Sequence, residues 1–543
     1  MVVQTNHPLG RVVAVGITAA MACASLVAAP VAAQAQSETQ ANQQKDVQVI
    51  AFQQTWNTIA KECADTYGPE GVAYVEVSPP QESIQGTQWW TSYQPVSYKL
   101  DSKLGTEAEF KNMVKQCSTA GVGIIADVVL NQTTGSDVAT GDQKGVAGSD
   151  YNGSTGSYPG FATKQYPDGI TAADFHSCKK NISDYTNQQE VQECRLSSMW
   201  DFDSESEKVQ DIQSDYLAKL WNLGVRGFRM DAVKHIHTDS MKAIKEKFAK
   251  KVGQNANDIY WIQEVIGNSS EAAGIQPSNY VQNGTVTEFG FKSEMNQTFK
   301  DKIANLKGLG ERLGKDLSSE DANVFVTNWD TARNEGALTY KDGAKYQLAN
   351  AFMLAYDYGT PRLLSDYKWD VDDNGVPGAT ATSVPDVDMD QACSTNKSDW
   401  NCEQRWTSTR GMIAFRNYVN GTKVADWQDD GGDNIAFSRG DKGFVAINNG
   451  KKDKDVSYTT SLADGEYCNV YATMDCSKTV TVKGGKVETT VPARSAIALY
   501  AGATKASHPA ASAATDPSDP DVSQEEDDAL PDDRSVTIYY KPS

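Results

Sequence analysis

The sequence lacks an excess of positive charge. Among 543 residues, 71 are acidic and 50 are Lys or Arg, so the formal net charge is −21 at pH 7. This charge argues against nucleic acid or an anionic surface as a partner. Beyond the first 35 residues, no apolar run approaches the length that spans a membrane. We therefore expect neither nucleic acid nor membrane as a partner, and we expect a monomer.

Two motifs are also missing. No pair of cysteines has C-x-x-C spacing, which argues against structural zinc bound by cysteines, and no glycine-rich phosphate loop is present. Without Cys23, which lies in the apolar N-terminal stretch, eight cysteines remain. An even number in an exported chain suggests four disulfides. The close pairs would be Cys178–Cys194, Cys393–Cys402 and Cys468–Cys476, which leaves Cys63–Cys117 as the long-range pair.

Residues 1–35 have the features of a secretory signal peptide. Arg11 provides a positive start, residues 12–29 are apolar, and Ala33-Gln34-Ala35 fits a cleavage site. We expect the protein to be secreted. The alternative is an uncleaved anchor, which would leave the protein bound to the membrane.

Short apolar segments alternate with helical segments up to residue 420. Strands are expected at residues 72–77, 122–130, 225–228, 259–263 and 324–327, and helices at 107–116, 208–223 and 240–251. This alternation predicts a parallel sheet with crossover helices. Several strands end in polar or acidic residues, which is typical of a (β/α)8 TIM barrel, here residues 36–131 and 199–420. A doubly wound open sheet would gather its site at one switch point.

Other segments break this rhythm. Residues 132–198 are too long for an ordinary loop and predict an irregular domain inserted after the third strand. Residues 421–502 contain short strands with turn signals, which predict a C-terminal antiparallel β domain. Residues 503–534 are typical of an acidic, Pro/Ala/Ser-rich linker. Residues 535–543 read as a strand, which is either the start of a truncated carbohydrate-binding module or a tail without structural meaning.

One run carries the most chemical information. Residues 225–228 form an apolar lead that ends in Arg229 and Asp231, which lie on the same side of a strand. A carboxylate beside a fixed guanidinium stays ionised, as a carboxylate nucleophile must. A lone R-x-D is more often a structural ion pair, so the surrounding motifs decide.

Four segments together resemble the α-amylase family of glycoside hydrolases (family 13). They are Asp127-Val128-Val129-Leu130-Asn131, the run at residues 227–235, Gln263-Glu264-Val265-Ile266, and Phe325-Val326-Thr327-Asn328-Trp329-Asp330. Residues 77–80, 89–90, 93–98 and 427–440 resemble the animal-like, chloride-dependent branch that includes secreted actinobacterial α-amylases. The resemblance covers about residues 47–502.

The resemblance implies three catalytic acids. Asp231 would be the nucleophile, Glu264 would protonate the leaving oxygen and then activate water, and Asp330 would help distort the sugar. Retaining glycosidases use two carboxyl groups about 5 Å apart in this way.

The resemblance also implies two ions. Arg229, Asn328 and Arg362 match the chloride ligands, and activity would need chloride. The alternative is that these arginines pair with ordinary carboxylates. Asn131, Asp201 and the main-chain oxygens of Gln192 and His235 match the calcium site, although Asn and Asp at strand ends are usually caps. Oxygen donors suit such a hard cation.

The expected substrate is starch or a related α-1,4-glucan. Aromatic side chains offer flat faces for sugar rings, although such residues are more often core. The candidate substrate-binding residues are Trp89, Trp90, Tyr93, Gln94, Asp127, Gln132, Lys234, His235 and Trp329. Gln132 and Trp329 stand where relatives carry histidines that hydrogen-bond the sugar, which predicts slower turnover or a reshaped subsite.

We expect a secreted, endo-acting α-amylase that hydrolyses internal α-1,4-glucosidic bonds of starch with retention. The first alternative is a 4-α-glucanotransferase of the same family, which would pass the glucosyl intermediate to a sugar. The second is a catalytically silent starch-binding protein. The complete set of three acids argues against the silent protein.

Overall fold

The computed structural model describes residues 45–137, 140–334, 336–395 and 397–507. The expected signal peptide, the linker from residue 508 onward and the segment 535–543 lie outside the described residues. Within the described ranges, no helix is long and apolar enough to cross a membrane.

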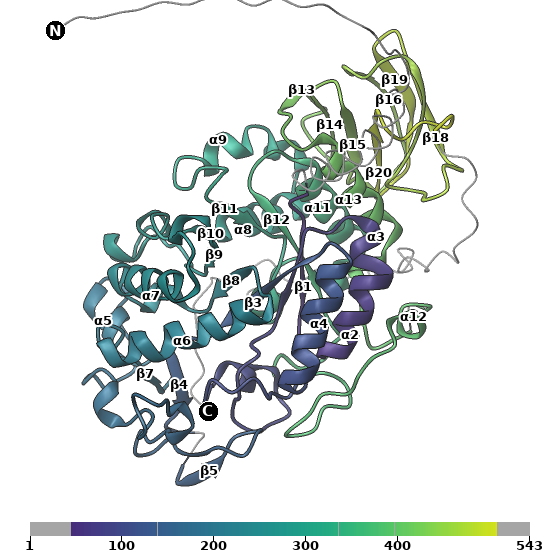
Figure 1. Ribbon diagram of the computed structural model, residues 1–543. Coiled ribbons are helices and arrows are strands. Elements are labelled where there is room, and N and C mark those ends of the chain that lie inside the picture. Colours follow the sequence, from purple (N-terminus) through teal and green to yellow (C-terminus); the bar gives the residue numbers. More distant parts are fainter. Residues whose placement is uncertain (1–44, 138–139, 335, 396, 508–543) are drawn as a thin grey trace, which may run out of the picture. The chain divides into compact units, whose positions relative to one another are not determined.

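Eight parallel strands close into a barrel, which confirms the predicted fold class (Figure 1). In spatial order they are β1 (Gln48–Ala51), β12 (Thr360–Ser365), β11 (Ala322–Val324), β10 (Thr285–Glu288), β9 (Tyr260–Gln263), β8 (Gly227–Met230), β3 (Gly123–Val128) and β2 (Tyr74–Val77). The expected strand at residues 324–327 lies earlier, at β11. Strands β1, β10 and β12 had not been singled out; β10 contains two threonines and a glutamate, and β12 begins with Thr-Pro-Arg, so neither is a purely apolar run.

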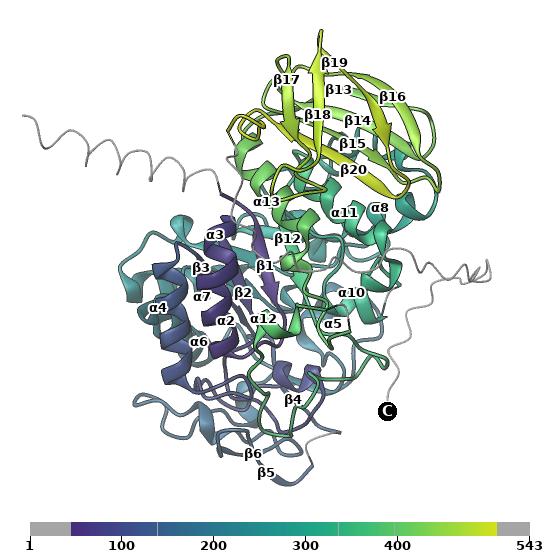
Figure 2. The ribbon, with the colours of Figure 1, turned by 90° about the vertical axis from the view of Figure 1, so that its right-hand side faces the viewer.

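Helices surround the barrel (Figure 2). The longer ones are α2 (Trp56–Glu62), α4 (Glu107–Thr119), α6 (Glu207–Leu223), α7 (Thr238–Val252), α8 (Phe289–Lys300), α11 (Ala344–Ala355) and α13 (Thr407–Val419). The shorter ones are α3 (Gly68–Glu70), α5 (Gln188–Glu193), α9 (Leu309–Leu313), α10 (Trp329–Asn334) and α12 (Met389–Ala392). Helix α4 shows why these segments are helical: Thr106 and Glu109 form a capping box, and Phe110, Met113 and Val114 recur on one buried face.

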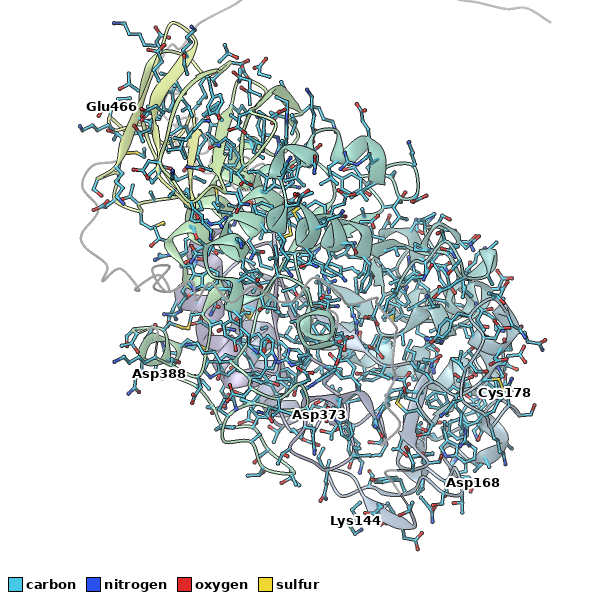
Figure 3. The ribbon with its side chains drawn as sticks, turned by 180° about the vertical axis from the view of Figure 1, so that it is seen from behind. Lys144, Asp168, Cys178, Asp373, Asp388 and Glu466 are labelled. Atoms are coloured by element: carbon cyan, nitrogen blue, oxygen red, sulfur yellow. A yellow bond between two sulfur atoms is a disulfide. The ribbon has the colours of Figure 1, made fainter. Side chains whose placement is uncertain are left out.

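The segment between β3 and β8 has a core of its own. Strand β4 (Gln132–Gly135) pairs with β7 (Met199–Asp201), and β5 (Asp142–Lys144) pairs with β6 (Asp150–Asn152). Buried aromatic side chains pack together here, including Tyr158, Phe175 and Trp200. Lys144, Asp168 and Cys178 mark the segment in Figure 3. Because β4 and β7 bracket it, its two ends are fixed beside the carboxyl end of β3.

The C-terminal part consists of two antiparallel sheets, as predicted. One sheet contains β13 (Val424–Asp429), β14 (Asn434–Arg439), β15 (Gly443–Asn448) and β20 (Ser495–Tyr500). The other contains β16 (Lys454–Thr459), β19 (Lys486–Val491), β18 (Thr479–Lys483) and β17 (Gly465–Cys468). Asn449 Nδ2 donates to the main-chain oxygen of Phe299 at 3.1 Å, which ties this part to α8.

Among the residues that the structure describes there are four disulfides, and they join the pairs expected from the sequence. They are Cys63–Cys117, Cys178–Cys194, Cys393–Cys402 and Cys468–Cys476. The first fastens the segment after α2 to α4, and the second lies in the inserted segment.

Candidate active site

A buried arginine holds three carboxylates at the carboxyl end of the barrel. Arg229 Nη1 lies 2.7 Å from Asp127 Oδ1 and 2.8 Å from Asp231 Oδ1, and its Nη2 lies 2.7 Å from Glu264 Oε1. The Arg229 side chain is 1% exposed. Surrounding negative charge raises the pKa of the Arg229 guanidinium well above its usual value, even though burial opposes this. The arginine is therefore a fixed cation that gathers acids from three strands.

Strand register explains why these residues meet. Asp127 on β3 is directly opposite Arg229 on β8, and Met230 is opposite Gln263 on β9. Asp231 and Glu264 each follow the last residue of their strand, so both emerge at the same edge of the barrel. Ala232 has φ +51°, a left-handed conformation that is uncommon outside glycine. This turn aims its N–H at Glu264 Oε2, 2.9 Å away, and so fixes the second carboxylate oxygen.

The acids differ in how easily they ionise. Burial and the nearby Glu264 carboxylate raise the pKa of Asp231 to about 6, against the lowering effect of Arg229. Gln132 Nε2 donates to Asp231 Oδ2 at 3.2 Å, and this hydrogen bond also lowers the Asp231 pKa. Burial, followed by Glu264, raises the pKa of Asp330 to about 8. Near neutral pH, Asp231 is mainly ionised and Asp330 mainly protonated.

Trp329 lies beneath this cluster and not on an open surface. Its ring stacks on Phe52, with centroids 5.1 Å apart, and the Arg229 guanidinium carbon lies 4.9 Å from its ring centre. It is 2% exposed. The indole therefore supports Arg229 by a cation–π contact and offers little surface to a ligand.

The predicted substrate residues separate into buried and accessible groups. Asp127 is buried and accepts from Tyr93 OH at 2.9 Å. Trp89 is packed against Phe52 and Tyr93, and its Nε1 donates to the main-chain oxygen of Asp372. Trp90 is only partly buried and donates to Asp373 Oδ1 at 3.2 Å, so it has a face open to solvent. Thus Trp89 is a core residue, while Trp90 remains a candidate platform.

Three further candidates are held by contacts of their own. Gln94 Oε1 accepts from the Gly135 N–H at 2.9 Å, which fastens the first turn of the inserted segment. Lys234 Nζ lies 2.5 Å from Glu271 Oε2. His235 Nδ1 lies 3.0 Å from the main-chain oxygen of Val191. None of these contacts involves the carboxylate cluster.

The predicted anion ligands are buried together with a carboxylate, so the alternative of an arginine paired with an ordinary carboxylate holds for Arg362. Arg362 on β12 pairs with Glu76 on β2, and both side chains are 1% exposed. The Nε of Arg229 and the Nε of Arg362 are buried without a protein acceptor. Asn328 Oδ1 accepts from the Thr331 N–H at 2.9 Å, so its amide nitrogen faces elsewhere. Two unpartnered donors fit an anion, but Glu76 already supplies negative charge to Arg362.

The predicted cation ligands also lie next to one another. Asp201 on β7 pairs in register with Gln132, and the Phe202 N–H donates to the main-chain oxygen of Asn131 at 2.9 Å. Asp201 Oδ1 and Asn131 Nδ2 are both buried without a protein partner. The oxygen and nitrogen atoms of an Asn side-chain amide are distinguished only by their hydrogen bonds. If the Asn131 amide is turned by half a rotation, its oxygen takes the position of Nδ2 and can bind a cation. Helix α5, with Gln192, contacts the turn that contains His235. This donor set fits a hard cation.

Sequence reasoning missed several residues of the site. Glu76 is an acidic residue inside the apolar strand predicted at residues 72–77. This setting is the sequence signal that could have identified it. Arg333 was also missed: it pairs with Asp366 at 2.8 Å, both fully buried, and it donates to the main-chain oxygen of Trp329 at 3.1 Å. It thereby fixes the start of α10, the helix that carries Asp330.

Comparisons with known proteins agree with this geometry. Residues 77–362 match the model described as "Alpha amylase, catalytic domain", and residues 424–502 match "Alpha amylase, C-terminal all-beta domain". The chain is 37% identical over 490 residues to an α-amylase of Streptomyces violaceus, which covers 90% of this chain and 79% of that protein. It is 38% identical over 448 residues to an α-amylase of Pecten maximus, with 79% and 86% covered.

Solved structures give the same result. The crystal structure of α-amylase I from Eisenia fetida matches with a TM-score of 0.77 and 33% identity, over 84% of this chain and 97% of that one. A mutant of the same protein, in complex with maltohexaose, matches equally well.

Proposed function

The chain belongs to the α-amylase family and is a glycoside hydrolase of the amylase type, and we propose that it is a secreted, endo-acting enzyme that cleaves internal α-1,4-glucosidic bonds of starch with retention. The observation that carries the proposal is the single guanidinium of Arg229 shared by Asp231 and Glu264. Four disulfides support an oxidising, extracellular location.

In the proposed mechanism, Asp231 attacks the anomeric carbon. Arg229 and Gln132 each hold one of its carboxylate oxygens, which keeps the nucleophile ionised and limits its rotation. Glu264 gives a proton to the leaving oxygen and then takes one from water, which releases the sugar with retained configuration. Asp330, mainly protonated near neutral pH, would donate a hydrogen bond to a sugar hydroxyl.

The glucan would lie across the carboxyl edge of the barrel, with Trp90 accessible to it. Gln132 is buried and would act through its hydrogen bond to Asp231. The maltohexaose complex of the Eisenia fetida α-amylase supports a glucan ligand for this fold. Lys234 and His235 would contact the sugars on the leaving-group side. We also propose the domain boundaries expected from the sequence, with an inserted domain at residues 132–198.

The first prediction tests the acid/base residue. Glu264→Gln keeps the size of the side chain but removes the proton transfer, so hydrolysis of soluble starch should fall by about 10²–10⁴-fold. Reducing-sugar release measures this. An equal rate for wild type and variant would refute the enzyme proposal. If short maltooligosaccharides are disproportionated instead of hydrolysed, the glucanotransferase is the right assignment.

The second prediction concerns the acid limb of the pH profile. The ionised form of Asp231 is the active one and its pKa is about 6, so kcat/KM should fall as the pH drops through about 6. Gln132→Met removes a hydrogen bond that favours the ionised form, so the limb should move to higher pH by about one unit. Gln213→Met is the control, because Gln213 donates to the Leu130 main-chain oxygen and contacts none of the acids. If the acid limb of the kcat/KM profile lies at the same pH in Gln132→Met as in wild type, Gln132 does not favour the ionised form of Asp231.

We also propose a calcium ion between Asn131 and Asp201, completed by the main-chain oxygens of Gln192 and His235. The ion would join the inserted segment to the barrel at the edge of the site. The unpartnered Asp201 Oδ1 supports this.

The third prediction follows from this cation. Because a ligand that binds only the folded state stabilises it, EDTA should lower the melting temperature and added Ca²⁺ should restore it. Asp201→Asn should abolish the Ca²⁺-dependent part of the shift. A wild-type melting temperature that is indifferent to both reagents would exclude the site.

We also propose that Arg229, Asn328 and Arg362 bind a chloride ion, but that they bind it weakly. The unpartnered Nε donors support an anion, whereas Glu76 neutralises Arg362 and would compete with it. Chloride should therefore bind weakly, and the requirement for it should be smaller than the family resemblance alone implies.

The fourth prediction tests this competition by binding as well as by activity. Melting temperatures are measured in chloride and in acetate at equal ionic strength. Glu76→Gln removes the competing charge, so half-saturation by chloride should occur at a concentration at least about ten-fold lower than in wild type. If chloride shifts neither protein and activity survives exhaustive dialysis, no chloride site exists.

A further inference from the structure

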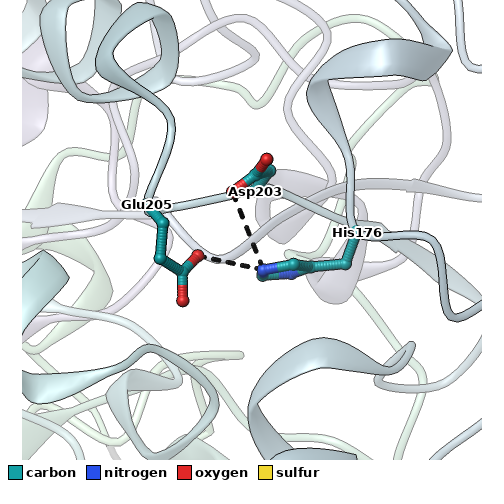
Figure 4. Close-up of side chains that lie close together, drawn as sticks. All are labelled: His176, Asp203 and Glu205. Atoms are coloured by element: carbon teal, nitrogen blue, oxygen red, sulfur yellow. Dashed lines mark hydrogen bonds and ion pairs between the residues drawn. The ribbon is translucent and has the colours of Figure 1, made fainter.

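A second cluster of possible metal ligands lies outside the carboxylate site. His176 in the inserted segment, and Asp203 and Glu205 after β7, have ligand atoms within 4.8 Å of one another (Figure 4). His176 Nε2 lies 3.0 Å from Glu205 Oε2 and 3.9 Å from Asp203 Oδ1. A second histidine, His237 at the start of α7, brings its Nε2 to 3.0 Å from Glu205 Oε1. His176, Asp203 and Glu205 thus form one close cluster, and His237 borders it at the second carboxylate oxygen of Glu205.

The orientation of His176 is the first argument for a metal. Its Nδ1 lies 2.6 Å from Oδ2 of Asp201, whose side chain is 2% exposed. A histidine that donates its Nδ1–H to a carboxylate has its ring fixed and presents a lone pair on Nε2. Here that nitrogen lies 3.0 Å from Glu205 Oε2, which only accepts, so an ion that binds here would take the place of the Nε2 proton. This carboxylate–histidine arrangement is the usual support for a metal-bound imidazole.

His237 provides an independent argument. Its Nε2 is buried, yet it has no hydrogen-bond partner, although Glu205 Oε1 is only 3.0 Å away. The nitrogen and the oxygen are close without being aligned for a hydrogen bond. Atoms that lie near each other in this way, because both point to a common centre, are the expected arrangement of two ligands of one ion.

The ligand types define the class of ion. Imidazole nitrogens with carboxylates favour Zn²⁺ and similar divalent transition metals, whereas Ca²⁺ takes oxygen ligands. His176, Asp203 and Glu205 would supply three positions of a tetrahedral zinc site, and His237, beside Glu205, would supply the fourth. Asp203 and Glu205 are partly exposed, so they can turn to close it.

We propose that His176, His237, Asp203 and Glu205 form a binding site for a zinc-class transition-metal ion, separate from the hard-cation site at Asn131 and Asp201. The ion would join the inserted segment, the chain after β7 and the start of α7, and would thereby stabilise the folded protein. This proposal does not depend on the proposed activity.

The test uses the full-length protein without a histidine tag, stripped with EDTA and then saturated with Ca²⁺. Zn²⁺ is titrated by calorimetry, and Co²⁺ by its visible absorption, which reports nitrogen and oxygen ligands in tetrahedral geometry. We expect one equivalent to bind in the presence of excess Ca²⁺ and to raise the melting temperature. Failure of both metals to bind, or their complete displacement by Ca²⁺, would overturn the proposal.

Two variants locate the site. His176→Gln and His237→Gln should each weaken Zn²⁺ binding at least ten-fold, and His508→Gln, which changes a histidine outside the described residues, should not. His237→Gln keeps the contact between His176 and Asp201. It therefore still tests Zn²⁺ binding at this site if His176→Gln fails to fold. Undiminished binding in the His237 variant would refute the site, because the metal would then be held elsewhere. Melting in Ca²⁺ alone serves as the folding control.

Discussion

The active site depends on the burial of one guanidinium. A buried arginine is costly unless its charge is compensated and its donors are satisfied, and Arg229 meets this demand with three carboxylates and the face of Trp329. The same contacts fix the positions of Asp231 and Glu264. Since three neighbouring strands supply the charged residues, the barrel register and the electrostatics of the site specify each other. A shift of one residue on any strand would turn a charged side chain away from the cluster.

One cation cannot compensate every acid in this space. Asp127, Asp231 and Glu264 contact Arg229 directly, whereas Asp330 does not. Burial, followed by the Glu264 charge, raises the pKa of Asp330 to about 8, and burial also raises the pKa of Asp127 well above its usual value despite its contact with Arg229. Arg333 is a further cation that lowers the pKa of Asp330, but Asp366 already pairs with it. Burial first, and the neighbouring acids second, therefore favour the protonated form of Asp330. A neutral carboxyl here can donate to a sugar hydroxyl without adding a further negative charge beside the nucleophile.

The sequence predicted what depends on local pattern. The barrel, the β domain and the disulfides follow from periodicity, strand-end polarity and cysteine spacing, and Asp231 was placed correctly beside Arg229. What it could not provide were contacts between residues far apart in the chain. Glu76 and Arg362 are separated by most of the barrel sequence yet meet across it, because β1 lies between their strands in the closed order. Trp89 and Trp329 look like sugar platforms in sequence, but their burial becomes visible only when Phe52 is placed against both.

The two departures from the family pattern have different physical consequences. Gln132 retains a donor and directs it at Asp231 itself, so the sugar contact that the resemblance implies at this position is replaced by one with the nucleophile. Trp329 is 2% exposed and its ring face supports Arg229, so it offers little surface to the substrate. Losing one hydrogen bond to the transition state commonly costs about 10²–10³ in rate. The firmer hold on Asp231 and Arg229 offsets part of that loss only if positioning of the nucleophile, and not contact with the sugar, limits turnover.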